Sequence, residues 1–399
     1  MRNFNVILIS LDCVRPDHLS CYGYNKINTK NIDSIAKESI IFTQAICQAP
    51  YTPASHASIF TGLNPYNHGI RQLHGDKLNK KCITLAETLK KHGYYCVAFI
   101  GADALNKVYS LNKGFDEYHQ PSDDKKIKFA GVAVNDWTNK LVNWFSSNKN
   151  KKFFLFLHHF ATHHGGSILL PKDCKKNKFF DYYDDKIKYF DEKIMALLIE
   201  ELSKYNLLEK TIIIITADHG ECLYEHNEFD SRCLGHRKFL YDSTLRVPLI
   251  IKIPNLKPKK IDSLVRLIDI FPTITGFLGV NFSQKIDGIN LLPLILNKKK
   301  EIKYAYSETK LDKRLISIRT EKWKLIFDGD TFEPNQLYNL KKDPKELINL
   351  MYENKDIVNR LKSILINIIK SSKEEKREAM TKSDEDYIKQ KLKNLGYLD

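Results

Sequence analysis

The stretch NVILISL at residues 5–11 decides the fold class that we predict for this chain. It is short, rich in branched aliphatic residues and bounded by polar residues, with Asp12 directly after it. A second stretch, TIIIITA at 211–217, has the same form and is followed by Asp218 and His219. Near-continuous apolar runs of this length are typical of strands that are buried on both faces of a parallel sheet. We therefore predict that both runs are strands of such a sheet.

Further runs of this kind alternate with amphipathic segments over the first 296 residues. FFLFL at 153–157 and VPLIIKI at 247–253 have the pattern of strands, whereas 83–93 and 184–202 have helical spacing. Alternating strands and helices predict an α/β fold, a doubly wound and mostly parallel sheet with helices on both faces.

The pattern changes to short alternating strands after about residue 296. Residues 353–371 then read as a helix, and 373–399 as a charged helical tail. We predict a main α/β domain at 1–296 and a small C-terminal α+β subdomain at 297–399. The subdomain would hold a small antiparallel sheet, the helix and the tail.

Composition and charge limit the classes of function. The chain has 399 residues, 43% of them hydrophobic, and a formal charge of +15 that comes mostly from lysine. The lysines are dispersed, without the basic and aromatic interleaving of nucleic-acid binders, so we expect no nucleic-acid partner and favour an anionic substrate or a solvated basic surface. The first apolar run is too short for an export signal, and no segment reaches the ~18 to 20 apolar residues of a transmembrane span. We therefore expect a cytoplasmic protein whose eight scattered cysteines are reduced thiols.

Side chains that can bind metal follow three of the predicted strands. Asp12 follows the first run, His158 the run at 153–157, and the pair Asp218 and His219 the run at 211–217. Functional groups of open α/β sheets gather beyond the carboxyl ends of the strands, so we expect these side chains to converge. Any one of them alone is more typical of a helix cap or a structural hydrogen bond. Together they suit one divalent ion, Mn²⁺ or Ca²⁺ with Zn²⁺ left open, rather than a soft metal.

The segment YTPASH at 51–56 permits two interpretations of Thr52. The Thr-Pro pair matches a helix N-cap followed by proline at the first helical position. A hydroxyl at a helix N-terminus also lies where an anionic ester would bind, and a metal contact would make it a nucleophile. His56 lies one helical turn after Thr52, on the same face of this predicted helix.

Nine segments in order resemble the sulfatase family of the alkaline-phosphatase superfamily, nearly from end to end. The opening strand and metal loop are LISLDCVRPDHLSCYGY, the nucleophile helix is YTPASHASIFTGLNPYNHG, and the second metal loop is TADHGE. The other segments are FLHHFATHHG, GHRKFLYDSTLRVPLIIKIP, RLIDIFPTITGFLGV, DGINLLPLIL, IRTEKWKLI and LGYLD. The resemblance implies an alkaline-phosphatase-like fold and a metal-dependent ester hydrolase.

The resemblance also implies roles for individual residues. Asp12, Asp218 and His219 would be metal ligands, and Thr52 would be both a ligand and the nucleophile. His56 stands where ordinary sulfatases have an arginine that steadies the nucleophile. Four further residues would hold the ester oxygens and the leaving group: His158, His163, His236 and Lys238. For two of these the neighbouring His159 and Arg237 are alternatives, and His68 would support its loop rather than react.

Three departures from the family pattern bear on the chemistry. Sulfatases oxidise a cysteine or serine to formylglycine, and threonine, which stands at position 52, cannot give that aldehyde. Cys13 replaces the second acidic residue of the first metal loop, and residues 101–105 read GADAL where a Lys-Trp-His segment is expected. We therefore expect no formylglycine.

These observations predict a metal-dependent hydrolase or transferase that forms a covalent adduct on Thr52. A threonine ester must be cleaved by attack on the transferred group, which favours a phosphate-type ester of a sugar, a lipid head group or a small molecule. Two alternatives remain open: a sulfate-ester hydrolase that works without formylglycine, and an inactive protein that keeps the fold to bind an anion. The sequence predicts neither the alcohol of the ester nor an oligomeric state.

Overall fold

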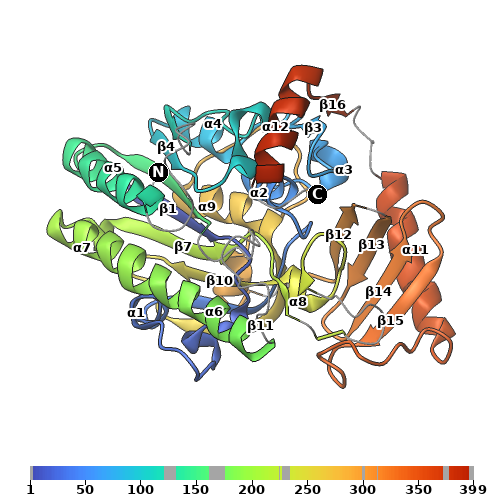
Figure 1. Cartoon of the computed structure of the whole chain (residues 1–399). Helices are drawn as coiled ribbons and strands as arrows, with labels where there is room; N and C mark the ends of the chain where they lie inside the picture. The colour runs from blue at the N-terminus through green and yellow to red at the C-terminus, as the bar shows by residue number, and fades with distance from the viewer. Residues whose placement is uncertain are drawn as a thin grey trace.

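An eight-stranded sheet forms the centre of the computed structural model (Figure 1), in the order β11-β2-β10-β7-β1-β6-β4-β5. The structure describes residues 3–120, 132–160, 176–223, 225–226, 234–298, 302–311, 313–371 and 377–394. The strands of the central sheet are β1 (Asn5–Leu11), β2 (Ile40–Ile46), β4 (Tyr95–Phe99), β5 (Glu117–His119), β6 (Phe153–His159), β7 (Thr211–Ala217), β10 (Arg246–Lys252) and β11 (Lys259–Arg266).

The strand β1 lies between β6 and β7 and runs parallel to both. Leu8 is aligned with Phe156 on one side and with Ile214 on the other. All residues of β1, β6 and β7 are buried, because helices cover both faces of the sheet. The predicted strands are confirmed, and the sheet is mostly parallel as expected. Only β10, among the strands of this sheet, runs antiparallel to both of its neighbours.

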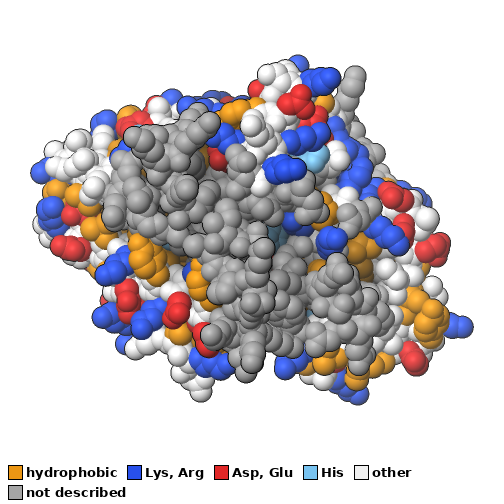
Figure 2. Space-filling view, in the orientation of Figure 1, with side chains coloured by type: hydrophobic (Ala, Val, Ile, Leu, Met, Phe, Trp, Pro, Cys, Tyr) orange, Lys and Arg blue, Asp and Glu red, His pale blue; other side chains and the backbone are white. Residues whose placement is uncertain are grey.

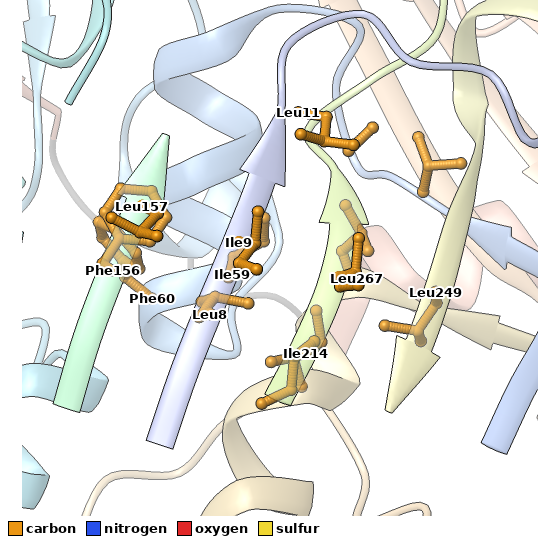
Figure 3. Packing of buried hydrophobic residues seen from close by; sticks show 14 of the residues in the cluster. Leu8, Ile9, Leu11, Ile59, Phe60, Phe156, Leu157, Ile214, Leu249 and Leu267 are labelled. Atoms are coloured by element: carbon orange, nitrogen blue, oxygen red, sulfur yellow. The ribbon is translucent and has the colours of Figure 1, made fainter. Parts of the chain in front are cut away.

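Helices pack on both faces of this sheet. Helix α2 contacts α4 and α9, whereas α1, α6 and α7 are linked through the π-helix Phe190–Met195, and α6 and α7 lie in front of the sheet in Figure 1. Figure 3 shows Ile59 and Phe60 of α2 beside Ile9 of β1 and Phe156 of β6. The helices of this part are α1 (Lys30–Ala36), α2 (Thr52–Thr61), α3 (Pro65–His68), α4 (Leu85–Lys90), α5 (Val132–Asn148), α6 (Lys176–Tyr189), α7 (Ala196–Lys204), α8 (Asp242–Leu245), α9 (Ile270–Leu278) and α10 (Leu292–Ile295). The 3-10 helices lie at Pro16–His18, Ser20–Tyr22, Asp103–Leu105, Lys107–Tyr109, Leu208–Lys210 and Leu267–Asp269.

A second, antiparallel sheet with its own hydrophobic cluster lies at one side of the molecule (Figure 1). Its strands are β12 (Ala305–Lys310), β13 (Arg314–Arg319), β14 (Trp323–Asp328) and β15 (Pro334–Asn339). Helix α11 (Lys355–Ser371) packs on it through buried residues that include Leu361 and Leu365. The small antiparallel subdomain is therefore confirmed, while the boundary between 296 and 297 stays a prediction.

The end of the described chain returns to the main sheet domain. Strand β16 (Glu378–Ala379) pairs with β3 (Asp76–Lys77), and helix α12 (Lys382–Asn394) buries Ile388 and Leu392 in the larger core. A further short pair joins β8 (Cys222–Leu223) to β9 (Leu234–Gly235). The helical tail was predicted, but its position against the first domain was not.

Charged side chains of both signs lie on the described surface (Figure 2). On the face drawn in Figure 2, lysine and arginine side chains are spread among acidic ones over the described surface. Among the cysteines that the structure describes, 13, 21, 47, 82 and 96 carry reduced thiols, whereas Cys222 is disulfide-bonded. The expectation that every thiol is reduced is therefore wrong at Cys222, because spacing along the chain does not reveal which thiols meet in the fold.

Within the described part of the chain, no helix is both long and apolar enough to cross a membrane.

Candidate active site and metal centre

The carboxyl ends of β1 and β7 bring the predicted metal ligands together. Asp12 and the pair Asp218 and His219 directly follow these strands, and their ligand atoms lie within 4.8 Å of one another. His219 Nε2 lies 3.8 Å from Asp12 Oδ1 and 3.4 Å from Asp218 Oδ2. All three side chains are fully buried. Two carboxylates and an imidazole thus converge as the sequence predicted.

Thr52 is the first residue of α2, and its side chain faces the same cluster. Its Oγ1 lies 3.5 Å from His219 Nε2, and Thr52 is fully buried. Tyr51 is extended, with φ −157° and ψ 146°, and holds the N-cap position without a side-chain capping bond. The interpretation of Thr52 as the N-cap is therefore wrong, because the helix begins one residue earlier than the Thr-Pro pair suggests, with Tyr51 at the N-cap position. The hydroxyl is directed to the cluster rather than to the helix backbone.

Hydrogen bonds fix the ring of His56 between α2 and β1. Its Nδ1–H donates to the carbonyl oxygen of Thr52 at 2.8 Å, and its Nε2 accepts from the hydroxyl of Ser10 at 2.9 Å. Burial lowers the pKa of His56 to about 3, so the ring is neutral. His56 is therefore a neutral ring that holds the first turn of α2 in place through hydrogen bonds.

Backbone contacts orient the acidic and imidazole groups of the second metal loop. Asp218 Oδ1 accepts from the backbone N–H groups of His219 at 2.9 Å and Cys13 at 3.3 Å. His219 Nδ1–H donates to the carbonyl oxygen of Gly220 at 3.0 Å, which leaves Nε2 as the ring atom available to a metal ion. A Cβ at Gly220 would lie 2.1 Å from the carbonyl oxygen of Ser243, so glycine permits this close approach.

The buried cluster changes the protonation equilibria of its members. Burial raises the pKa of Asp12 to about 6, although His219 opposes this shift. Burial alone would lower the pKa of His219, but the carboxylates of Asp218 and Asp12 outweigh it and raise the pKa. His158 Nε2 lies 3.4 Å from Asp12 Oδ2, and burial lowers the pKa of His158 to about 4. Acidic and basic groups thus share one buried space, where burial and neighbouring charges shift their pKa values in opposite directions.

A buried carboxylate and imidazole lie beside the ligand cluster. His236 Nδ1 lies 3.4 Å from both carboxylate oxygens of Glu221 and 3.6 Å from Cys13 Sγ. The rings of His236 and His219 have centroids 4.2 Å apart. His236 therefore belongs to this site, next to the loop that carries His219.

The remaining predicted residues have different positions. Lys238 has an exposed side chain, and its backbone N–H donates to the carbonyl oxygen of His236 at 2.7 Å. Its alternative, Arg237, has a left-handed φ of 67° and donates its backbone N–H to Pro50, just before α2. His159, the alternative to His158, packs on the ring of Phe190. His163 lies outside the described residues.

His68 has the supporting role that was predicted for it. Its Nδ1 accepts from the backbone N–H of Ile70 at 3.2 Å, and its Nε2 lies 3.0 Å from the hydroxyl of Ser58 in α2. The ring therefore ties α2 to the loop that follows it.

Sequence reasoning did not single out several residues that shape this site. Ser10 lies within a run of strand residues, Ser55 donates from α2 to the carbonyl oxygen of Asp218 at 2.6 Å, and Glu221 approaches a histidine fifteen positions later. Of these three residues, only Glu221 gave a signal in the sequence, because it belongs to the DHGE stretch at 218–221. The partners of the two serines become visible only in the folded chain.

Two family models match this chain. The model named Sulfatase matches residues 4–280, and the model for the C-terminal part of N-sulphoglucosamine sulphohydrolase matches residues 225–371. The first of these covers well over half of the chain.

Curated relatives match over most of their length at low identity. Arylsulfatase K from Gallus gallus is 24% identical, over 92% of this chain and 82% of the relative. N-acetylglucosamine-6-O-sulfatase from Bacteroides thetaiotaomicron is also 24% identical, over 86% of this chain and 81% of the relative.

Solved structures share the fold. A structure described as a putative sulfatase from Bacteroides thetaiotaomicron matches with a TM-score of 0.79 and 20% identity, over 96% of each chain. The phosphonate monoester hydrolase of Agrobacterium radiobacter matches with a TM-score of 0.74 and 20% identity, over 92% of this chain and 95% of that chain.

Proposed function

Since the chain belongs to the sulfatase family, a family of ester hydrolases, we propose that it is a metal-dependent hydrolase or transferase that cleaves a phosphate-type ester through a covalent adduct on Thr52. The observation that supports this most is the position of the Thr52 hydroxyl. It lies 3.5 Å from His219 Nε2, at the first residue of a helix and inside the ligand cluster. A hydroxyl placed at a helix N-terminus and beside metal ligands is where a nucleophile for an anionic ester is expected.

The residues present fit a divalent ion. Asp218 Oδ2 is buried and has no hydrogen-bond partner within the described part of the chain, and it faces His219 Nε2 at 3.4 Å. A buried carboxylate oxygen without a donor is costly, and a cation at this point would remove that cost. Asp12, Asp218 and His219 would hold the ion, with Thr52 beside it. When bound, the ion would lower the pKa of the Thr52 hydroxyl and neutralise charge on the transferred group.

The chain's own residues would carry the two steps of the reaction. Thr52 Oγ forms a bond to phosphorus while the bond to the leaving alcohol breaks, and the alcohol takes up a proton. His236, oriented by Glu221, is the buried imidazole that we assign to that proton transfer. Water, or another acceptor in a transferase, then attacks phosphorus and gives a proton to His236. The bond between phosphorus and Thr52 Oγ breaks, and Thr52 takes up from solvent the proton that it released there in the first step. His56 keeps the first turn of α2 in position throughout.

A sulfate ester is the second candidate substrate, and the names of the relatives favour it. Both curated relatives above are sulfatases by name. Threonine cannot form the hydrated aldehyde from which sulfate leaves by cleavage of a carbon–oxygen bond. A sulfated Thr52 would have to be released by attack on sulfur, which is the step that distinguishes the two candidates.

A substrate panel tests the proposed function. Aryl sulfate, phosphate monoester, phosphodiester and phosphonate esters would be assayed with several divalent ions, with Thr52→Ala as the control for background turnover. We expect Thr52-dependent turnover of at least one phosphorus ester. Turnover of sulfate alone would support the second candidate. No turnover with any ester and ion would favour the inactive, anion-binding alternative.

Removal of the metal or of a ligand gives the first specific prediction. Chelation should abolish activity, and Asp218→Asn or His219→Ala should reduce it by several orders of magnitude, because the ion both activates the nucleophile and neutralises charge. Elemental analysis should show bound metal in the parent and much less in both variants. Full activity in a preparation shown to contain no metal would contradict the assignment.

A further inference from the structure

Cys13 has an unusual backbone conformation at the end of β1. Its φ is 63°, in the left-handed region that residues other than glycine seldom adopt. The side chain is fully buried and its thiol is free. The backbone N–H of Cys13 donates to Asp218 Oδ1 at 3.3 Å, so this conformation is tied to the ligand cluster. Strained backbone of this kind persists where the surrounding structure holds it, often at functional sites.

The thiol lies among the ligand atoms. Cys13 Sγ is 3.0 Å from Asp12 Oδ1 and 3.6 Å from His236 Nδ1, and Cys13, His219 and His236 form a second ligand group within 4.8 Å. Ligand atoms around one tetrahedral ion, with bonds of about 2.0 to 2.3 Å, lie about 3 to 4 Å apart. The separations of Cys13 Sγ from Asp12 Oδ1 and from His236 Nδ1 lie in this range.

A second observation, independent of the thiol, also indicates a cation here. Asp218 Oδ2 is buried and has no hydrogen-bond partner among the described residues, and it approaches Nε2 of His219, the residue that the two ligand groups share. The other interpretation of Cys13 is a thiol that only donates a hydrogen bond to Asp12. Cys13 contacts only Oδ1 of the Asp218 carboxylate, through its backbone N–H, so the cation that Oδ2 calls for is indicated without any assumption about the thiol.

We propose that Cys13 is itself a ligand of the metal ion and that its sulfur makes the centre prefer Zn²⁺ to Mn²⁺ and Ca²⁺. This inference rests on the metal-dependent part of the proposed function. A thiolate carries the same charge as a carboxylate, so the total charge of the ligand set matches that of an all-carboxylate set, and only the softness of one ligand changes. Thiolate and imidazole ligands suit Zn²⁺, whereas Mn²⁺ and Ca²⁺ favour oxygen ligands. The sequence alone predicted Mn²⁺ or Ca²⁺ and left Zn²⁺ open, because it did not establish that the Cys13 thiol faces the cluster.

Metal replacement with a spectroscopic probe tests this directly. The full-length chain would be stripped with a chelator and loaded with Co²⁺, whose bond to a thiolate gives a near-ultraviolet charge-transfer band. We expect this band in the parent and in Cys21→Ser, a control at a free thiol away from the cluster, and its loss in Cys13→Ser. In competition with a chromophoric chelator, Cys13→Ser should bind Zn²⁺ at least about tenfold more weakly than the parent.

The variant Cys13→Asp gives a second measurement if Cys13→Ser does not fold. Aspartate tolerates the left-handed conformation better than most residues and keeps the charge of a ligand. We expect Cys13→Asp to shift the ratio of Zn²⁺ to Mn²⁺ affinity toward Mn²⁺ by at least about tenfold.

The outcomes separate this inference from the proposed function. If Co²⁺ binds in a manner that depends on Asp218, but without a thiolate band and with unchanged Zn²⁺ affinity in Cys13→Ser, then Cys13 is not a ligand and the metal-dependent function stands. If the parent binds none of these ions, both are overturned. A thiolate band without turnover of any ester would support the ligand role of Cys13 and contradict the proposed function.

Discussion

Among the described residues, the hydroxyl of Thr52 makes one long contact, 3.5 Å to His219 Nε2, and the N-cap position belongs to Tyr51. We therefore predict that Thr52→Ala changes the free energy of unfolding by no more than about 1 kcal/mol. Loss of a nucleophile should nevertheless reduce turnover by several orders of magnitude. Urea denaturation and steady-state assays on the same preparation would measure the two effects.

The matched variant Thr52→Ser keeps a hydroxyl at the same position and should retain measurable activity. Rapid acid quenching of the parent or of Thr52→Ser should trap a phosphorylated peptide that contains residue 52. If Thr52→Ala turned over substrate at nearly the parental rate, the assignment of Thr52 as nucleophile would be wrong.

At the residue scale, the sequence predicted the groups whose positions follow from strand ends. Asp12 and Asp218 converge because both follow buried parallel strands that are neighbours in the sheet. Ser10 and Cys13 could not be assigned in this way. Ser10 contributes through a hydrogen bond to His56 of α2, which lies far along the chain. The direction of the Cys13 thiol depends on a left-handed φ, and nothing in the sequence indicates that this cysteine adopts it.

At the scale of elements, His68 connects α2 with the loop after it, and it does so only as a neutral ring. The Nδ1 atom accepts from Ile70, so a proton there would face another donor. Burial lowers the pKa of His68 from 6.5 to about 3. The unfolded chain takes up a proton at higher pH than the folded chain does, so the contribution of His68 to stability is complete above pH 6.5 and declines as pH falls toward 3.

We predict that this residue alone accounts for a loss of about 2 kcal/mol between about pH 7 and about pH 5. The variant His68→Gln should be less stable than the parent at neutral pH, yet lose less stability on acidification. Urea titrations of both proteins at the two pH values would measure the difference. Equal losses in parent and variant would show that His68 is not the group that titrates.

The elements themselves were largely predictable, and their orientation was less so. The runs at 5–11 and 211–217 became β1 and β7 with the predicted bounds, because continuous apolar runs of that length leave few alternatives. The run near 247–253 has the same composition, but β10 is antiparallel to its neighbours. Its orientation depends on the long connection from β7, which carries no periodic pattern that indicates a direction.

At the scale of the whole molecule, buried charges connect the C-terminal sheet to the main domain. Lys324 of β14 is fully buried and lies 2.5 Å from Asp242 Oδ1 and 2.8 Å from Glu346 Oε1. Asp242 begins α8, a few residues after His236 and Lys238. Arg319 of β13 also pairs with Asp242, at 3.0 Å. The loop that carries His236 is thus anchored to the second sheet.

Removal of Lys324 should lower the stability of the fold. The carboxylates of Asp242 and Glu346 would then remain buried with less positive charge beside them. We predict that Lys324→Met lowers the free energy of unfolding by about 3 to 5 kcal/mol. The control is Lys362→Met, at a partly exposed lysine that pairs with Glu333 at 3.2 Å, and it should cost no more than about 1 kcal/mol. Similar effects of the two substitutions would contradict an anchoring role for Lys324.

The position of the tail could not be read from its sequence, which is dominated by charge. Only a few apolar residues mark the buried face of α12. The surface of the main domain that they contact forms only when the chain folds, so the sequence does not reveal it. Met380, Ile388 and Leu392 belong to the larger core, and the backbone N–H of Met380 donates to the carbonyl oxygen of Gly75 at 2.8 Å. The C-terminal tail is therefore part of the main domain's packing.

This packing gives the last prediction, which concerns Ile388. Its side chain is fully buried on α12, whereas Ile366 on α11 is 39% exposed. Ile388→Ala should lower the free energy of unfolding by about 2 to 4 kcal/mol, since it leaves a cavity between the tail and the core, and Ile366→Ala should cost much less. Neither residue lies in the proposed active site, so we expect turnover per folded molecule to equal that of the parent in both variants. Denaturation curves and active-site titration would measure the two quantities, and equal stability losses at the two positions would show that the tail does not pack on the main domain in solution.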